Sequence, residues 1–341
     1  MKRRLVEVWP RWSAYAAAAW SFGYGCLALA WAAGRPGFPF DSGAAMASRE
    51  YTAALMAVLC FLSSWFATRL TVSRTGGWRS KARVGIASAI AVTLAVLVPD
   101  ARAIAAAAYA PIFLIGAPFG WPPVSFSVAV PWPVWHQYIC IMGGFLWAAA
   151  ALGCWRRSRR ACVVCGRNAS ASQWRQARSA ARWGKWATWV AVLVPSFYAT
   201  TRLAWALGIP LGITDAFLRE GQEIGMWWAG AALAGVAIGG AILTLGLQQR
   251  WGEVFPSWIP AAGGRRVPPL LAIIPAGLVA TLSLASGLDT VGHFLRDGFP
   301  DEGWGATAPG LLWPLWGAAL SAATLAYYYR RRGRCEHCGR A

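Results

Sequence analysis

The sequence predicts an all-α integral membrane protein with eight transmembrane helices, arranged as two parallel four-helix repeats. Three observations favour this fold class. Hydrophobic residues make up 57% of the chain and charged residues only 13%, which is too apolar for a soluble enzyme of this length. Apolar segments long enough to cross about 30 Å of hydrocarbon recur along the chain. Each half of the chain also ends in the same short cysteine motif.

One crossing of the membrane takes roughly 20 residues, and each predicted span is about that long. The third apolar segment, 84–116, is too long for one crossing and contains Pro99-Asp100-Ala101-Arg102, so we expect the helix to break there and its tail to be interfacial. The first span follows Met1-Lys2-Arg3-Arg4, but its counterpart in the second half lies mid-chain, so we expect a retained helix and no cleaved signal peptide. The expected spans are 12–33, 51–69, 84–105, 134–155, 184–207, 226–247, 268–288 and 309–329.

The distribution of charge predicts the topology. If both termini are cytoplasmic, the inner segments contain 26 of the 32 basic residues and only three of the 13 acidic ones. This bias follows the positive-inside rule for a multi-pass protein of the cell membrane, and it explains the net charge of +19 without nucleic acid. The inner arginine clusters are expected to meet anionic lipid headgroups. Inner loops are expected around Arg74, Arg160 and Arg265, and outer ones around Asp41, Trp121, Glu220 and Asp301.

The two halves, 1–168 and 169–341, resemble a tandem duplication. Aligning Cys162 with Cys335 also aligns Cys165 with Cys338, and the Gly-Arg pair that follows each motif. The sequence LAWAAG at 29–34 recurs as LAWALG at 203–208. With an even number of helices in each half, the repeats would enter the membrane in the same orientation.

The two Cys-x-x-Cys-Gly-Arg motifs, which we call knuckles, predict one metal site. Cys162, Cys165, Cys335 and Cys338 are four thiols at the spacing of zinc knuckles, and a glycine after the second cysteine lets the backbone curl around the ion. We therefore expect a structural zinc clasp on the cytosolic side that joins the repeats. A redox dithiol pair and four separate reduced thiols are the alternatives. His337 is a competing ligand without a counterpart in the first knuckle, where Val164 stands.

The remaining thiols lie in apolar segments, where a free cysteine behaves as a small hydrophobic residue, so we expect them to pack in the core. They are Cys26, Cys60, Cys140 and Cys154.

Polar residues gather where the seventh span ends. If the helix continues, Asp289, His293, Arg296 and Asp297 fall on one face. That face would suit a cation or a headgroup, and an enzyme acting there would use His293 as a general base oriented by Asp289 or Asp297. The simpler interpretation is that these charges hydrate an outer loop.

The loop between the sixth and seventh spans contains the pattern WGxxxPxWxPxxGGRRVP, from Trp251 to Pro268. This pattern resembles uncharacterised multi-pass membrane proteins of high-GC Gram-positive bacteria, in which four-helix units occur singly or in tandem. The resemblance is strong over the second half and weak over the first, where 71–85 retains only the tryptophan, the glycines and the basic residues. It implies a fold and a location, and no activity.

Three functions remain open at this stage. The leading hypothesis is a non-enzymatic membrane scaffold or regulatory partner, because the expected helices contain no constellation of acid, base and nucleophile. A transporter of a small molecule or lipid would require a cavity between the repeats. An outer-face enzyme on a lipid-linked substrate would require a cleft beside Asp289 and His293.

Overall fold

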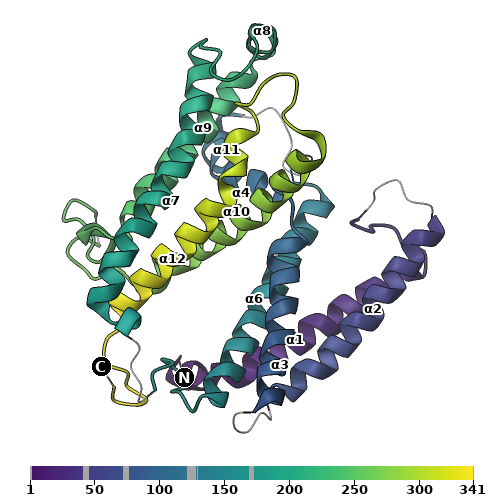
Figure 1. The fold of residues 1–341 in the computed structure, drawn as a ribbon, viewed down its shortest axis with the longest axis vertical. Coiled ribbons are helices and arrows are strands. Elements are labelled where there is room, and N and C mark those ends of the chain that lie inside the picture. Colours follow the sequence, from purple (N-terminus) through teal and green to yellow (C-terminus); the bar gives the residue numbers. More distant parts are fainter. Residues whose placement is uncertain are drawn as a thin grey trace. The chain divides into compact units, whose positions relative to one another are not determined.

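A computed structural model describes residues 2–40, 46–71, 77–120, 128, 130–168, 173–260 and 262–340 (Figure 1). Asp41, Arg74 and Trp121, three of the topology markers, lie outside these residues. The described chain is helical and contains no β-strand. Its α-helices are α1 (Lys2–Ala32), α2 (Met46–Arg69), α3 (Trp78–Val92), α4 (Ala101–Gly116), α6 (Trp132–Ser158), α7 (Ala177–Ala206), α8 (Asp215–Glu223), α9 (Met226–Leu245), α10 (Pro269–Asp297), α11 (Ala308–Leu311) and α12 (Trp313–Arg331).

Five helical stretches among the described residues are long and apolar enough to cross a membrane. They are Ser48–Arg69, Trp78–Leu97, Trp132–Ser158, Met226–Leu245 and Pro269–Asp297. The other three expected spans, 12–33, 184–207 and 309–329, are helical as α1, α7 and α12 but are not among the five. These three helices contain several tryptophan, tyrosine, serine or threonine residues between their aliphatic ones. The class of apolar helical protein is thus confirmed, and five of the eight spans are supported by length and composition.

Contacts divide the chain into two compact units. Unit 1 contains residues 1–98, 130–171 and 333–341, and unit 2 contains 99–129 and 172–332. The knuckle at the C-terminus therefore belongs to unit 1. In unit 1, α1 packs against α2 and α6, and α6 also packs against α3. In unit 2, α7 packs against α9 and α12, and α12 also packs against α10, so the order of neighbouring helices is the same in both units.

A glycine lies at a close helix crossing in each unit. A Cβ atom on Gly144 of α6 would lie 2.6 Å from the Ala95 Cβ atom and 2.9 Å from the Ala91 carbonyl oxygen. A Cβ atom on Gly317 of α12 would lie 2.6 Å from the Ala280 carbonyl oxygen of α10. Small residues let helix backbones approach this closely inside membranes.

The helix ends are also alike in the two units. Gly34 after α1 and Gly208 after α7 have φ of 79° and 81°, the left-handed conformation that ends a helix most readily with glycine. The Arg157 guanidinium of α6 donates to the carbonyl of Leu70, just beyond α2. The Arg330 guanidinium of α12 donates in the same way to the carbonyl of Leu247, just beyond α9.

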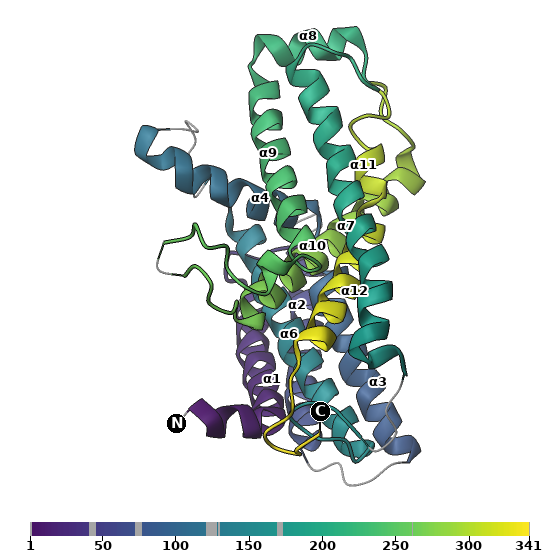
Figure 2. The same cartoon turned by 90° about the vertical axis from the view of Figure 1, so that its left-hand side faces the viewer.

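The expected break in the third apolar segment is confirmed. A π-helical turn, η1 (Thr93–Leu97), follows α3, and α4 begins after Pro99 and Asp100. Although α4 comes from the first half of the sequence, it belongs to unit 2 and packs against α9 and α10 (Figure 2). The Asp289 carboxylate of α10 accepts the backbone N–H of Ala101 at 3.1 Å, which caps the start of α4.

Candidate metal centre

The two knuckles fold into the same tight turn. In the first, the Cys162 N–H donates to the Arg167 carbonyl at 2.8 Å, and the Gly166 N–H donates to the Cys162 carbonyl at 2.8 Å. In the second, Cys335 donates to Arg340 at 2.9 Å, and Gly339 donates to Cys335 at 2.7 Å. Gly166 and Gly339 have φ of 72° and 69°, where a side chain would be strained. The glycine of the motif therefore has the backbone role that its position predicts.

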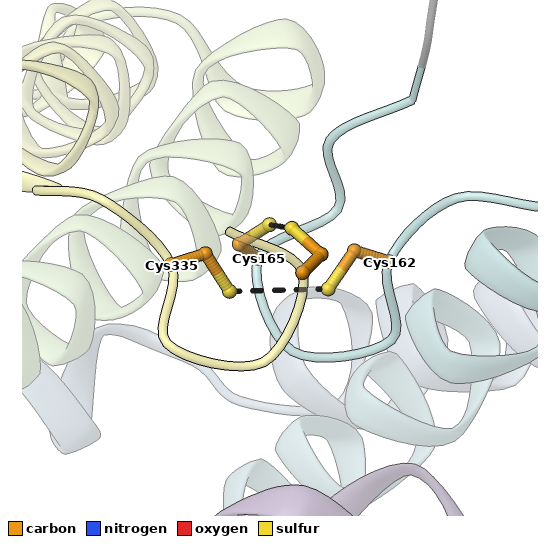
Figure 3. Close-up of side chains that lie close together, drawn as sticks. Cys162, Cys165 and Cys335 are labelled. Atoms are coloured by element: carbon orange, nitrogen blue, oxygen red, sulfur yellow. Dashed lines mark hydrogen bonds between the residues drawn. The ribbon is translucent and has the colours of Figure 1, made fainter. Parts of the chain in front are cut away.

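These turns bring the four cysteines together although 173 residues separate each pair (Figure 3). The sulfur atoms of Cys162 and Cys335 lie 4.0 Å apart, and those of Cys165 and Cys338 lie 3.6 Å apart. All four sulfurs lie within 4.8 Å of one another. Ligands at the Zn–S bond length of about 2.3 Å stand about 3.8 Å apart in a tetrahedron, so the cluster is slightly wider than a closed site.

Arginines link the two turns to each other. The Arg167 guanidinium donates to the carbonyls of Gly333 and Arg340, both at 3.0 Å. In return, the Arg340 guanidinium donates to the Arg167 carbonyl at 3.3 Å. Each knuckle thus carries an arginine two residues after its second cysteine, and these positive charges would offset the −2 charge of a metal tetrathiolate.

The first knuckle is also held by its own helix. Arg156 of α6 donates to the carbonyls of Val163 and Val164, both at 2.9 Å, and lies over the Trp9 ring at 5.2 Å from its centroid. The equivalent position before the second knuckle is Tyr329, whose ring packs against Trp174 instead. The first turn is thus held against α6, and the second turn contacts the first through the sulfur pairs and the arginine exchange.

Burial raises the pKa of the Cys165 thiol to about 12, and a backbone hydrogen bond from Arg167 acts in the opposite direction. Without a cation, this thiol stays protonated at neutral pH. A bound divalent metal reverses that preference, because a coordinating thiol is deprotonated outright. The donor set therefore suits a thiophilic metal ion, and no other group of three or more ligating residues occurs in the described part of the chain. His337 is exposed and is not a member of this group.

The other four cysteines lie in helices, as expected for packing residues. Cys140 and Cys154 are buried in core clusters, and Cys60 is partly buried beside one of them. Cys26 differs, because its side chain is exposed on α1.

The polar face at the end of α10 forms as the spacing predicts, because the helix continues to Asp297. The Nε2 atom of His293 lies 3.5 Å from an Asp289 carboxylate oxygen, and its Nδ1 atom lies 3.9 Å from Asp297. The His293 side chain is 61% exposed, and Arg296 lies 3.4 Å from its Nδ1 atom. Asp289 already caps α4 through Ala101. The contacts shown here are those of a hydrated helix end that joins α10 to α4.

A second buried polar cluster, in unit 1, was not anticipated from sequence. His136 of α6 is only 1% exposed, and its Nε2 atom shares a hydrogen bond with the Tyr24 hydroxyl of α1 and lies 3.5 Å from the Cys140 sulfur. Four aromatic rings surround it, those of Tyr24, Trp31, Phe40 and Trp132. The i, i+4 spacing of His136 and Cys140 was the only local signal, because Tyr24 is 112 residues away in sequence.

Comparisons with protein-family models, with curated proteins and with solved structures gave no match to this chain. The functional assignment must therefore come from the geometry of the site.

Proposed function

We propose that the protein is a multi-pass scaffold or regulatory partner of the cell membrane, without enzymatic activity, in which one zinc ion clasps the C-terminal knuckle to the first. The observation that carries this proposal is the convergence of four sulfurs, within 4.8 Å, from two turns of the same backbone geometry. When bound, zinc supplies four metal–thiolate bonds and no redox chemistry. Cys162, Cys165, Cys335 and Cys338 would be its ligands.

The asymmetry between the knuckles indicates what the clasp does. Arg156 braces the first turn against α6, so that turn stays in place without metal. The second turn follows α12 after three residues and contacts the first turn through the sulfurs and through the exchange between Arg167 and Arg340. Metal binding would therefore control the position of the last nine residues, and this is the kind of change that a protein partner can detect.

The proposal includes the topology and the duplication. Charge asymmetry supports cytoplasmic termini, which would place the clasp in the cytosol. The duplication is supported by the crossings at Gly144 and Gly317, which are 173 residues apart, as are the paired cysteines. The same offset relates Arg157 to Arg330, which cap equivalent helices.

The zinc content of the purified full-length chain tests the clasp. We expect one zinc per chain by inductively coupled plasma mass spectrometry, and we expect Cys338→Ser to lose it because a structural site needs all four ligands. Cys26→Ser is the matched thiol control and His337→Ala the control for a competing ligand, and both should retain one zinc. Loss of zinc in His337→Ala would replace the four-sulfur site by a three-sulfur and imidazole site.

Hydrogen exchange separates a clasp from a passive site. Chelation should deprotect the backbone of 333–340 strongly and that of 162–167 only weakly. Metal-free protein containing disulfides between the facing pairs, Cys162 with Cys335 and Cys165 with Cys338, would overturn the zinc proposal in favour of a redox function.

The topology is tested by labelling substituted cysteines in intact cells. Glu220→Cys should react with an impermeant reagent, and reaction of Gly264→Cys would refute the orientation.

A further inference from the structure

The loop between α9 and α10, residues 246–268, is folded in a defined way. Its two arms meet in a short antiparallel bridge between Val254 and Arg266. The Phe255 N–H donates to the Arg265 carbonyl at 3.0 Å, and the Val267 N–H donates to the Glu253 carbonyl at 3.0 Å. A loop with its own backbone pairing has a fixed shape, so the side chains on its surface have fixed positions.

Hydrogen bonds and ion pairs from α12 hold this loop in position. The Tyr327 hydroxyl donates to the Gly252 carbonyl at 2.7 Å, and the Arg331 guanidinium donates to the Val267 carbonyl at 2.6 Å. Arg330 and Arg331 also form ion pairs with Glu253, at 3.3 Å and 3.9 Å. The two arginine side chains are only about one-seventh exposed, 15% and 14%, so these pairs are less screened than surface ones.

The start of the loop crosses directly over the end of α9. A Cβ atom on Gly252 would overlap the carbonyl group of Gly246, and a Cβ atom on Gly246 would lie 2.5 Å from the Trp251 ring. Only glycine at both positions allows this approach. The loop therefore places three aromatic rings, those of Trp251, Phe255 and Trp258, over the space between the end of α9 and the start of α10. We call these three residues the roof.

Beneath this roof lies a cavity of about 680 Å³ within unit 2. Its walls include Leu243 and Leu247 from the end of α9, Leu271 from α10, and Trp251, Phe255 and Trp258 from the loop. The volume lies in the range of ligand pockets, about 300–1,000 Å³. Along α10 the lining runs from Leu271 to Val279, which is about 12 Å at 1.5 Å per residue, so the cavity is elongated along the helix.

The lining offers almost nothing for water to bind. The Thr244 hydroxyl donates to the Gly240 carbonyl of its own helix, and the buried indole N–H of Trp316 has no hydrogen-bond partner. A buried water needs two to four polar partners, so one N–H group does not retain it. Leu243, Trp258 and Leu271 are 69%, 79% and 59% exposed, which shows that the rim opens to the surroundings.

Both helices that frame the cavity, α9 and α10, are long and apolar enough to span a membrane. A cavity at the ends of two spans opens to lipid at the boundary between hydrocarbon and headgroups. Arg265 and Arg266 are exposed on the loop next to Val267, which lines the cavity. A guanidinium pairs well with a phosphate at this boundary.

We propose that the cavity between α9, α10 and the loop binds one hydrocarbon chain of an anionic membrane phospholipid, whose phosphate pairs with Arg265 and Arg266. Unit 2 thereby holds a lipid as a fixed part of its surface. This site is independent of the zinc clasp, because it contains none of the four cysteines and lies within the other unit.

Glycines of α9 offer a matched pair of variants for the test. Cβ atoms on Gly239 and Gly240 would both meet nothing within 4 Å, but only Gly240 lines the cavity. Gly240→Phe should project a ring into the cavity, whereas Gly239→Phe adds the same ring at the same depth on another side of the helix. Trp258→Ala is a second variant, which removes part of the roof at an exposed position.

The probe is phosphatidylglycerol with a diazirine in one acyl chain, photolysed with the full-length protein in nanodiscs. We expect cross-links to concentrate in peptides covering 240–279 and to fall at least about tenfold in Gly240→Phe, which corresponds to displacing about two methylene groups. Trp258→Ala should also lower labelling, and Gly239→Phe should not. A single symmetric size-exclusion peak and an unchanged apparent Tm for each variant report whether the chain has folded.

A second arm tests the headgroup. The double variant Arg265→Gln, Arg266→Gln should lose the preference for phosphatidylglycerol over the equivalent phosphatidylcholine probe while still being labelled by both. Equal labelling of Gly239→Phe and Gly240→Phe would overturn the proposal, since it would mean ordinary lipid contact along α9. Labelling that stays low in the unmodified protein, because a copurified protein covers the cavity, would also overturn it and assign the surface to a protein partner.

Discussion

The glycine crossings allow the sharpest quantitative prediction about the fold. In Gly317→Ala, the new methyl group would lie 2.6 Å from the Ala280 carbonyl oxygen and 2.8 Å from the Leu284 backbone nitrogen. Backbone atoms inside a helix cannot swing aside as a flexible side chain can. Helices α10 and α12 must therefore move apart along their whole contact. Gly144→Ala sets the same conflict between α6 and the backbone of Ala91 and Ala95.

The expected cost follows from two opposing effects. Overpacking a tight contact costs about 1–3 kcal/mol, and backbone contacts place these two sites in the upper part of that range. Replacing glycine by alanine in a helix returns up to about 1 kcal/mol of helix propensity. We expect a net destabilisation of about 1–2 kcal/mol for each variant. Gly277→Ala on α10 and Gly85→Ala on α3 meet no atom within 4 Å and should retain only the gain.

The assay is thermal unfolding of the full-length protein in detergent, followed by size-exclusion chromatography with fluorescence detection. A difference of about 2–3 kcal/mol between a crossing variant and its control corresponds to an apparent Tm difference of about 3–4 °C for a protein of 341 residues. The two crossing variants should be affected similarly. If Gly317→Ala melts with or above Gly277→Ala, the crossing is looser than its geometry indicates, and the comparison between units loses its main support.

Two further predictions concern polar contacts. Arg157→Lys and Arg330→Lys retain the positive charge but lose the forked donor that reaches the carbonyl of Leu70 or of Leu247, respectively. The topology found by cysteine labelling should be unchanged while the free energy of unfolding falls by about 1 kcal/mol; a change of orientation would refute a purely structural role. Asp289→Ala should cost about 1 kcal/mol in thermal unfolding because it removes the cap of α4, whereas His293→Ala should stay within about 0.5 kcal/mol because its ring is mostly exposed. Equal effects of the two variants would contradict the capping role of Asp289.

Features with a local origin could be predicted from sequence. Apolar segments define the helices because a helix satisfies its own backbone within the segment. The break at Pro99 is also local, because proline restricts the residue before it and lacks an N–H group. The cysteine cluster connects distant residues, but it was predictable because the same motif occurs twice and four thiols suit one ion.

Features that depend on partners far away in sequence could not be predicted. The start of α4 is capped by Asp289, 188 residues away, and this contact belongs to unit 2 although α4 follows the helices of unit 1. Glu253 forms ion pairs with Arg330 and Arg331 of α12 and so helps to hold the loop over the cavity. Periodicity and spacing carry no information about pairs of this kind.

The arginines of this chain illustrate how one residue type meets two physical requirements. Topology requires positive charge on one side of the membrane, and lysine would supply it equally well. Yet only three of the 32 basic residues are lysines. The carbonyls at the end of a helix lack partners within the helix, and a guanidinium can donate several hydrogen bonds while its charge interacts favourably with the helix dipole. Among the described residues, the arginines that donate to backbone carbonyls near helix ends or in the knuckles include Arg156, Arg157, Arg167, Arg330, Arg331 and Arg332. The basic residues that would orient the chain are therefore also residues that donate hydrogen bonds to carbonyls at its helix ends, in its knuckles and in the loop between α9 and α10. The need for these hydrogen bonds explains the preference for arginine over lysine.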